Sequence, residues 1–570
     1  MKSKKSFTRI TLLSTLIVFV AFIFVIKLYY LQILNHKEFV AVADKQYIKP
    51  KTSLFDRGSI YFENKNGDIV SVATLTSGYS LVLDPRKIKN ASTTYERLNV
   101  VIPLDEKTFY TKAGKTSDPY EEVAKKVSQD KGTEISNLNL AGVSLYKDKW
   151  RFYPGGTIAS NVIGFVAYKG NDLVGRYGLE KHYEDVLSRK TTNLYANFYI
   201  EIFANLKQSL SLDQSSEGNI VATIEPTVEA ALEEEVTKIH EKWTSEKTGA
   251  IIMDPNTGEI IAMAIRPTFN PNTYSTEVDA SVYGNPMVES VYEMGSIIKP
   301  LTMAAGLDLG SITANTSYFD KGFVKADTET IYNHSKFVNG QTNMQTVLDK
   351  SLNTGAAFIV EKMGTKNFAA YMYDFGLNEK TAIDLPNEAR NIVSGLKSPR
   401  EVEYITASYG QGIALSPVST VRALSVLANG GLLVRPHVVK RINYTSGLTK
   451  IIEETAPKQA IKKTTSDEIT RMLVSVVDNA LLGGKYKNKH YSIAAKTGTA
   501  QIAQPGSTGY YKDRYLHSFF GYFPAYKPKF LIFLFTVYPK SAGFAADTLS
   551  KPFFDLSDFL INYYNVPPDR

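Results

Sequence analysis

Residues 530–537 read Phe-Leu-Ile-Phe-Leu-Phe-Thr-Val, an apolar run close to the C-terminus. A short continuous apolar run rich in aromatic and β-branched residues is typical of a buried strand. Just upstream, residues 518–523 read Ser-Phe-Phe-Gly-Tyr-Phe and predict a second one. The C-terminal part of the chain therefore supplies neighbouring strands to the core of a sheet.

Two more strands are predicted far upstream. Residues 250–253 (Ala-Ile-Ile-Met) and 260–263 (Ile-Ile-Ala-Met) flank Asp254-Pro-Asn-Thr-Gly258, a strong hairpin signal. The chain between these strands and the C-terminal ones is mostly helical in pattern, as at 297–309 and 417–428. Strands at both ends with helices between them predict one α/β domain whose sheet joins distant parts of the chain. Further helices are expected over 226–240 and about 553–564.

The N-terminus predicts a membrane anchor. Residues 10–26 carry no charge, and the apolar character continues to residue 34, which is long enough for a spanning helix. Lys2, Lys4, Lys5 and Arg9 precede the run, so the positive-inside rule places residues 1–9 in the cytoplasm and the chain beyond residue 35 outside. A cleaved signal peptide is the alternative, but Ala41-Val-Ala43 lies too far beyond an overlong apolar core.

Composition excludes several classes of protein. At 570 residues the chain should hold two or three domains. The absence of cysteine excludes disulfides, thiol catalysis and cysteine-bound metals. Seven scattered histidines contain no H-x-x-x-H pair, so no metal and no cofactor is expected. The net charge of +8 forms no basic stripe, which argues against nucleic-acid binding.

Three short strings occur in a fixed order: Ser296-Ile-Ile-Lys299, Ser351-Leu-Asn353 and Lys496-Thr497-Gly498. Together they supply a serine nucleophile, two lysines and a polar relay, which suffice for acyl transfer without histidine or metal. Each string alone is weak, because S-x-x-K also occurs at Ser128, Ser144 and Ser394, and K-T-G also occurs at Lys247. Only the first set lies in suitable local contexts.

Ser296 opens an apolar helical segment, and the spacing of three places Lys299 one turn away on the same face. The positive end of the helix dipole favours an alkoxide on Ser296 and disfavours a charged Lys299. Burial lowers a lysine pKa in the same direction. A neutral Lys299 can then take the serine proton. An ordinary amphipathic helix start is the alternative for this string taken alone.

The other two strings supply polar groups. Ser351 and Asn353 can point the same way on a turn or extended segment, although a helix cap would use the same residue types. Lys496-Thr497-Gly498-Thr499 reads as a strand, in which Gly498 allows a ligand backbone to approach closely. Lys496, Thr497 and Thr499 are candidates for binding a substrate carboxylate. The earlier Lys247-Thr-Gly249 is interpreted as structural.

With these three strings the chain resembles the penicillin-binding proteins, in particular the class B, monofunctional transpeptidase type. The middle string reads Ser351-Leu-Asn353 where the family's is often S-D-N, and Met294 stands where the family usually has proline. Other landmarks lie along nearly the whole chain: Arg57-Gly58, Arg151–Gly156, Tyr292–Gly295, Tyr409–Gly412, Ser416-Pro417 and His517–Gly521.

The resemblance implies an α/β multi-domain protein. It implies a cytoplasmic tail (1–9), a transmembrane helix (10–34), an elongated, β-rich α+β pedestal resembling a dimerisation domain (35–240) and a transpeptidase domain (241–570). The transpeptidase domain is expected to have the penicillin-binding, serine β-lactamase-like fold, an antiparallel five-stranded sheet flanked by helices. No glycosyltransferase segment is evident before it.

The implied activity is that of a D,D-transpeptidase acting on peptidoglycan stem peptides that end in D-Ala-D-Ala. By resemblance, Ser296 attacks the penultimate D-Ala and Lys299 receives its proton. The backbone N–H groups of Ser296 and Thr499 form the oxyanion hole. Ser351 and Lys496 pass a proton to the departing D-Ala. Asn353 holds the donor peptide, and Thr497, Gly498 and Thr499 bind its carboxylate end.

Partners and location follow from the same resemblance. The substrates are a D-Ala-D-Ala donor and an amine acceptor, and β-lactams are covalent inhibitors at Ser296. A membrane glycan polymerase of the shape, elongation, division or sporulation type and other proteins of the division or elongation complex are expected partners. The protein is expected to be a single-pass protein of the bacterial cell membrane with its catalytic domain outside, in a septal role rather than in elongation.

Two other functions fit the same residues. A membrane-anchored β-lactam sensor, carboxypeptidase or β-lactamase-like hydrolase would use the acyl-enzyme but transfer it to water or retain it. A nonenzymatic cell-wall scaffold would need no intact site, whereas all three strings are complete here. Rapid turnover of penicillin would indicate a hydrolase, and full cross-linking in cells by Ser296→Ala would indicate a scaffold.

Overall fold

The computed structural model describes residues 55–570 except 171, 190–215, 335–336, 453–455, 505 and 507–508, together with 15, 18–24 and 27. The described chain forms two compact units. The first comprises Leu75–Trp150, and the second comprises Arg57–Thr74, Arg151–Arg189 and the chain from residue 216 onward.

The first unit is a small α+β body. Its helices are α3 (Ala91–Val101), α4 (Glu106–Ala113) and α5 (Gln129–Asn137), and β3 (Glu121–Val127) pairs with β2 (Ile69–Leu83), which in turn pairs with β4 (Val143–Phe152). Each helix begins at a side-chain cap, respectively Asn90, Asp105 and Ser128. Its core consists of Leu81, Leu83, Leu98, Phe109, Ala113, Val127 and Ile135.

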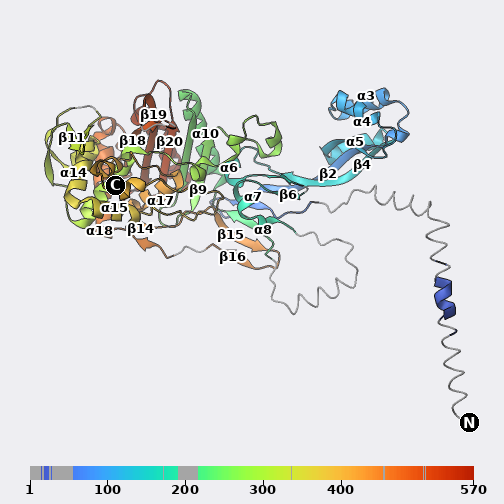
Figure 1. The fold of residues 1–570 in the computed structure, drawn as a ribbon, viewed down its shortest axis with the longest axis horizontal. Coiled ribbons are helices and arrows are strands. Elements are labelled where there is room, and N and C mark those ends of the chain that lie inside the picture. Colours follow the sequence, from blue (N-terminus) through green and yellow to red (C-terminus); the bar gives the residue numbers. More distant parts are fainter. Residues whose placement is uncertain are drawn as a thin grey trace, which may run out of the picture. The chain divides into compact units, whose positions relative to one another are not determined.

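The second unit is built on a five-stranded antiparallel sheet (Figure 1). Its strand order is β18 (Ala494–Ala503), β19 (Tyr510–Phe523), β20 (Phe530–Val537), β8 (Lys247–Met253) and β9 (Ile260–Arg266). The predicted hairpin therefore pairs with the C-terminal strands, Phe533 of β20 lying opposite Ile251 of β8. The prediction of a sheet that joins distant parts of the chain is confirmed, and all of β20 is buried.

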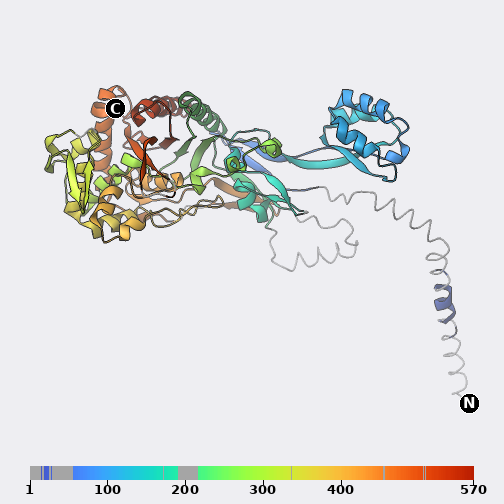
Figure 2. The same ribbon diagram turned by 45° about the horizontal axis from the view of Figure 1, so that its top comes forward.

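Helices cover both faces of this sheet, because successive strand residues point to opposite sides. Phe519 packs with α10 (Pro226–Trp243) and α19 (Ala545–Tyr563), which lie together on one side in Figure 2. The next residue, Phe520, joins the cluster on the other face, which is covered by α12 (Lys299–Leu309), α17 (Pro417–Ala428) and α18 (Lys463–Ser475).

A small lobe and several helices occupy the chain between β9 and β18. In the lobe, β10 (Ser317–Asp320) pairs with β13 (Gly340–Asn343), and β11 (Phe323–Ala326) pairs with β12 (Glu329–Tyr332). The helices are α11 (Pro286–Glu289), α13 (Met344–Asp349), α14 (Asn353–Met363), α15 (Thr365–Asp374) and α16 (Glu401–Ala407). The short strands β14 (Leu432–Leu433) and β17 (Lys458–Gln459) pair with each other.

A second sheet of this unit joins the early chain to the late chain. β1 (Ile60–Glu63) pairs with the first residues of β2 across the turn at Asn66-Gly67, and it also pairs with β7 (Gly218–Ala222). β7 pairs with β15 (Val439–Tyr444), which pairs with β16 (Thr449–Ile451). Nearby are the hairpin β5 (Val166–Lys169) with β6 (Asp172–Gly175) and the short helices α6 (Ser160–Ile163), α7 (Gly178–His182) and α8 (Glu184–Leu187).

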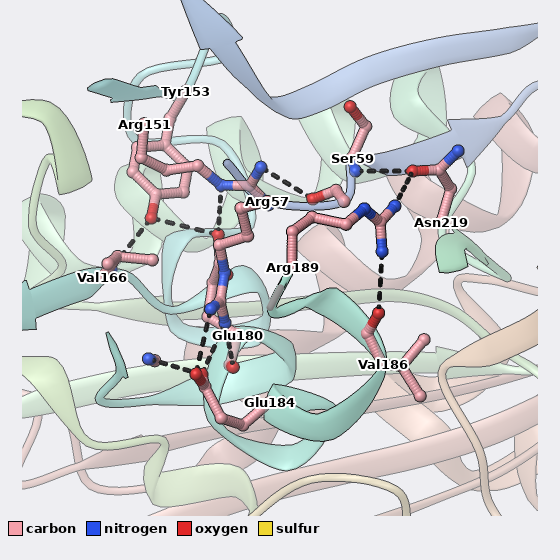
Figure 3. Close-up of polar contacts among 12 residues, drawn as sticks. Arg57, Ser59, Arg151, Tyr153, Val166, Glu180, Glu184, Val186, Arg189 and Asn219 are labelled. Atoms are coloured by element: carbon pink, nitrogen blue, oxygen red, sulfur yellow. Dashed lines mark hydrogen bonds and ion pairs between the residues drawn. The ribbon is translucent and has the colours of Figure 1, made fainter. Parts of the chain in front are cut away.

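Two sequence landmarks from this region, Arg57-Gly58 and Arg151–Gly156, meet in one buried ionic cluster (Figure 3). Glu180 is fully buried, and its two carboxylate oxygens each lie 2.6 Å from an arginine Nε, one of Arg57 and the other of Arg151. Arg57 also pairs with Glu184 at 2.7 Å, and Tyr153 donates a hydrogen bond to Glu180. The cluster joins the residues just before β1, the end of β4 from Arg151 onward and α7, so these landmarks contribute to structure within the second unit.

Most of the predicted transmembrane segment, 10–34, and the whole tail, 1–9, lie outside the described residues. Residues 15, 18–24 and 27, which are described, are helical. Among the described residues, no helix has both the length and the apolar character that crossing a membrane requires.

Candidate active site

Ser296 lies in a tight turn of helix, Gly295–Ile298, directly before α12. Gly295 donates its N–H to the carbonyl oxygen of Gly410 at 3.0 Å, which ties the predicted Tyr409–Gly412 landmark to the serine turn. Gly410 has a φ of +81°, and a Cβ there would lie 2.2 Å from the Gly295 oxygen. Two backbones therefore cross at a position that only glycine allows.

Lys299 is the first residue of α12 and is 1% exposed. Its Nζ donates to the backbone oxygen of Ser351 at 2.5 Å and to the Ser351 Oγ at 3.2 Å. Burial, and secondarily the charge of Lys496, hold the pKa of Lys299 well below its ordinary value. The structure thus joins the first and second strings through an amine that favours its neutral form.

Ser351 lies in a turn with a φ of +54°, and Asn353 begins α14. Leu352 between them is buried, whereas Ser351 and Asn353 are half-buried. The Nδ2 of Asn353 donates to the backbone oxygen of Tyr332 at 2.9 Å, which fixes the plane of the amide. The sequence left two possibilities for this string, a turn and the start of a helix, and the structure contains both: Ser351 lies in a turn that leads directly into α14.

The third string lies on β18, at the edge of the five-stranded sheet. Lys496 is 4% exposed, and its Nζ donates to the Thr497 oxygen at 3.1 Å. Burial lowers the pKa of Lys496 to about 8, against an opposing contribution from Asp349, which raises it. Thr497 and Thr499 are half-buried, and Thr499 Oγ1 accepts the N–H of Ala545 at 3.2 Å.

Gly498 allows a close approach, but of protein atoms. A Cβ on Gly498 would lie 2.4 Å from Ser518 Oγ, 2.8 Å from the Met294 oxygen and 3.0 Å from the Ile297 nitrogen. The space on the Cβ side of Gly498 is therefore occupied by the serine turn and by Ser518. This contact is what places β18 directly beside Ser296.

The structure brings all three strings into one site. The serine turn touches β18 at Gly498, Lys299 bonds Ser351, and Lys496 is close enough for its charge to lower the pKa of Lys299. Lys247 of the second K-T-G string begins β8, two strands away from β19 in the sheet order. Its interpretation as structural agrees with that position.

Sequence reasoning missed several supporting residues. Ser518 Oγ donates to the Met294 oxygen at 2.8 Å and so holds the serine turn on the sheet. Glu293 accepts from Gly412 N–H at 3.1 Å and from Tyr510 OH at 3.2 Å, and burial raises its pKa. Glu293 and Ser518 lie within two of the landmarks named from the sequence, Tyr292–Gly295 and His517–Gly521, but the sequence assigned no role to either residue.

Asp349 had no signal at all in the sequence. It accepts a hydrogen bond from Gln345 at 2.9 Å, and its charge raises the pKa of Lys496. An acidic residue near the end of a helix resembles many surface residues, so only the packing of α13 against the site could show its effect.

Comparison with known proteins agrees with this geometry. Residues 248–555, more than half of the chain, match the family described as penicillin binding protein transpeptidase domain, and 54–193 match the penicillin-binding protein dimerisation domain.

Two relatives and one solved structure illustrate the likeness. The stage V sporulation protein D of Bacillus subtilis is 30% identical, over 92% of this chain and 81% of the relative. The peptidoglycan D,D-transpeptidase FtsI of Buchnera aphidicola is 26% identical, over 98% and 96%. The crystal structure of penicillin-binding protein 3 from Mycobacterium tuberculosis, complexed with aztreonam, superposes with a TM-score of 0.68 at 21% identity, over 91% and 98%, and so supports the fold.

The dimerisation and transpeptidase domains occur in the same order as in the class B enzymes, and a serine–lysine pair lies beside the edge of the five-stranded sheet. This chain therefore belongs to the class B penicillin-binding proteins and is a transpeptidase.

Proposed function

We propose that Ser296 is the nucleophile with which this chain carries out peptidoglycan D,D-transpeptidation in cell-wall synthesis. Ser296 Oγ attacks the carbonyl of the penultimate D-Ala, and its proton moves to Lys299. The bond to the terminal D-Ala then breaks, and the departing amine takes a proton delivered through Ser351 and Lys496. An amine of a neighbouring stem peptide attacks the ester, forms the cross-link and returns the proton to Ser296.

The observation that carries this proposal is the environment of Lys299. A base must be neutral to accept a proton, and burial beside Lys496 favours the neutral amine. Its contacts with Ser351 at 2.5 and 3.2 Å leave Lys299 between the nucleophile turn and the second serine. The same lysine can therefore serve the step that forms the acyl-enzyme and the step that resolves it.

The remaining polar groups would bind the substrate. The backbone N–H groups of Ser296 and Thr499 form the proposed oxyanion hole, since the backbone of Thr499 lies within about 3.0 Å of a Cβ placed on Gly295. The fixed amide of Asn353 holds the donor peptide. Lys496, Thr497 and Thr499, with Gly498 between the threonines, bind the terminal carboxylate.

Anchoring, domain limits and partners also belong to the proposal. Residues 10–34 form the single membrane span, with 1–9 in the cytoplasm, a pedestal from 35 to 240 and the catalytic domain, 241–570, outside. The apolar run and the basic residues before it support this arrangement. A membrane glycan polymerase and division-complex proteins are the proposed partners, and the proposed role is septal.

Acylation by a fluorescent penicillin followed by peptide mapping tests the site. We expect one lasting adduct, on Ser296, and none on Ser296→Ala. Ser394→Ala is the matched control, because Ser394-Gly-Leu-Lys397 has the same spacing but lies in another short helical turn. An adduct on a different serine would refute the assignment. Rapid release of hydrolysed penicillin would support a hydrolase instead.

A further inference from the structure

A buried carboxylate in the lobe holds a network of side chains beside the second string. Asp320, at the end of β10, is fully buried. Its oxygens accept hydrogen bonds from Gly322 N–H at 2.8 Å, from Asn333 Nδ2 at 3.0 and 3.1 Å, from Asn339 Nδ2 at 2.6 Å and from Thr354 Oγ1 at 2.9 Å. A buried charge with this many donors is satisfied and well fixed.

This network ends on the catalytic segment. Asn333 Oδ1, held by Asp320, accepts the backbone N–H of Thr354 at 3.1 Å. The preceding residue of the lobe, Tyr332, offers its backbone oxygen to Asn353 Nδ2. Two consecutive residues of the lobe, Tyr332 and Asn333, are therefore bonded to the consecutive residues Asn353 and Thr354. Asp320 itself bonds both Asn333 and Thr354.

The segment from Ser351 to Thr354 is therefore fixed from two sides. Lys299 bonds the Ser351 oxygen on one side, and the Asp320 network holds Thr354 on the other. A φ of +54° is unfavourable for serine and persists only where surrounding contacts enforce it. Because Asn353 lies between the two anchors, its amide has little freedom to rotate.

The charge of Asp320 strengthens this support. Burial alone would raise its pKa, but the donors from Asn339, Gly322 and Thr354 outweigh burial and hold the pKa of Asp320 below its ordinary value. The carboxylate also contacts the first turn of α14, where a negative charge interacts favourably with the helix dipole.

We propose that Asp320 is a positioning residue of the transpeptidase reaction, which orients the Asn353 amide toward the donor substrate through Asn333 and Thr354. This inference rests on the role proposed above for Asn353. One N–H of Asn353 is held by Tyr332, so the second N–H has a defined direction for a substrate carbonyl. Asp320 itself touches neither substrate nor nucleophile.

The test compares two penams that differ in one group. Benzylpenicillin carries an acylamino carbonyl that Asn353 can hold, whereas a penam without the acylamino group has none. Asp320→Asn replaces one carboxylate oxygen with an amide NH2 group, which cannot accept the hydrogen bonds that Asp320 receives. We expect this variant to slow acylation by benzylpenicillin about 10-fold and acylation by the bare penam less than about 2-fold. Thr354→Val, a milder variant of similar shape, should show the same selectivity if Asp320→Asn folds poorly.

A double-mutant cycle separates the positioning role inferred for Asp320 from the substrate-binding role proposed for Asn353. In an Asn353→Ala background, Asp320→Asn should slow benzylpenicillin acylation no further, because the residue through which it acts is gone. Equal slowing for both penams, or an additive effect in the cycle, would overturn the inference about Asp320. If Asn353→Ala is itself unselective between the penams, the role proposed for Asn353 fails first.

Asp384→Asn is the matched control. Asp384 is 5% exposed and accepts bonds from Val438 N–H, Val439 N–H and Tyr183 OH at 2.7, 2.9 and 3.1 Å. The Asp384→Asn variant should lower the melting temperature, as Asp320→Asn does, but its rates of acylation by the two penams should change equally. Selectivity in this control would mean that general loosening, and not the Asp320 network, produces the effect.

Discussion

The amine of Lys299 lies 2.5 Å from the backbone oxygen of Ser351 and 3.2 Å from its hydroxyl, although the two residues belong to different strings of the sequence. Burial, and secondarily the charge of Lys496, lower the pKa of a lysine so placed well below its ordinary value, which favours the neutral amine. This contact links the turn that carries Ser296, the proposed nucleophile, to the segment that carries Ser351, a member of the proposed proton relay.

Replacing Lys299 should remove that base. We expect Lys299→Ala to slow acylation of Ser296 by fluorescent penicillin about 10²- to 10⁴-fold, the usual contribution of a general base. Stopped-flow or gel-based labelling measures the rate, and circular dichroism checks folding. Lys362→Ala, at the C-terminal end of α14, is the control. A variant that retains a tenth or more of the wild-type rate would contradict the assignment.

The rate of acylation should depend on pH in a predictable direction. Because the proposed general base, Lys299, accepts a proton only in its neutral form, the rate should fall as pH drops through its depressed pKa. Asp349 raises the pKa of Lys496, so Asp349→Asn should lower that pKa below about 8. If Lys496 acts in its protonated form, the alkaline limb of the pH–rate profile moves to lower pH.

The matched variant for this measurement is Asp467→Asn, an exposed carboxylate paired with Lys463 on α18. Its profile should coincide with that of the wild type. An alkaline limb that stays in place in Asp349→Asn would show that Lys496 does not set it.

Gly498→Ala should displace the serine turn. The added methyl would come within 2.4 Å of Ser518 Oγ and 2.8 Å of the Met294 oxygen, and one of these is backbone. A shift of about 1 Å in a nucleophile can cost roughly 100-fold in rate. Acylation kinetics measure the loss. Gly543→Ala, where a Cβ meets open space, should react normally; equal rates in both variants would count against a steric role for Gly498.

The Glu180 cluster should matter for stability and not for chemistry. Glu180→Gln leaves Arg57 and Arg151 as buried cations that lack their shared carboxylate, which typically costs about 3–5 kcal/mol. Urea unfolding of the purified protein measures this loss. Penicillin should still acylate the folded fraction at the normal rate, and a slow rate in fully folded protein would contradict the structural role.

The same cluster gives a pH dependence of known sign. Burial alone would raise the pKa of Glu180, but Arg151 and Arg57 hold it below the ordinary value of 4.5. Its contribution is therefore complete above that value and is lost as pH falls through the lower, folded pKa. Glu184→Gln, which alters a partly exposed partner of Arg57, should have a smaller effect.

Local patterns predicted much of the fold. The runs at 518–523 and 530–537 and the hairpin around Asp254–Gly258 lie in one sheet, and the helix predicted over 417–428 is α17. The sheet whose strands come from widely separated parts of the chain was harder to predict. β15, from the catalytic region, pairs with β7, and no local pattern indicates which distant strand will be its neighbour. The charged residues 121–127 form the strand β3, because this segment pairs with β2.

Side-chain chemistry and short spacings, which are local properties, were enough for the sequence alone to select Ser296, Lys299, Lys496 and the Ser351–Asn353 string as candidate site residues. The resemblance carried by these strings, and no single spacing, predicted the order of the domains. Tertiary structure alone decided that Gly498 receives the serine turn, that Asp349 raises the pKa of Lys496 and that Asp320 bonds Thr354, the residue after Asn353. Those relationships depend on packing between segments far apart in the chain, where distance and burial set the strength of every hydrogen bond and charge.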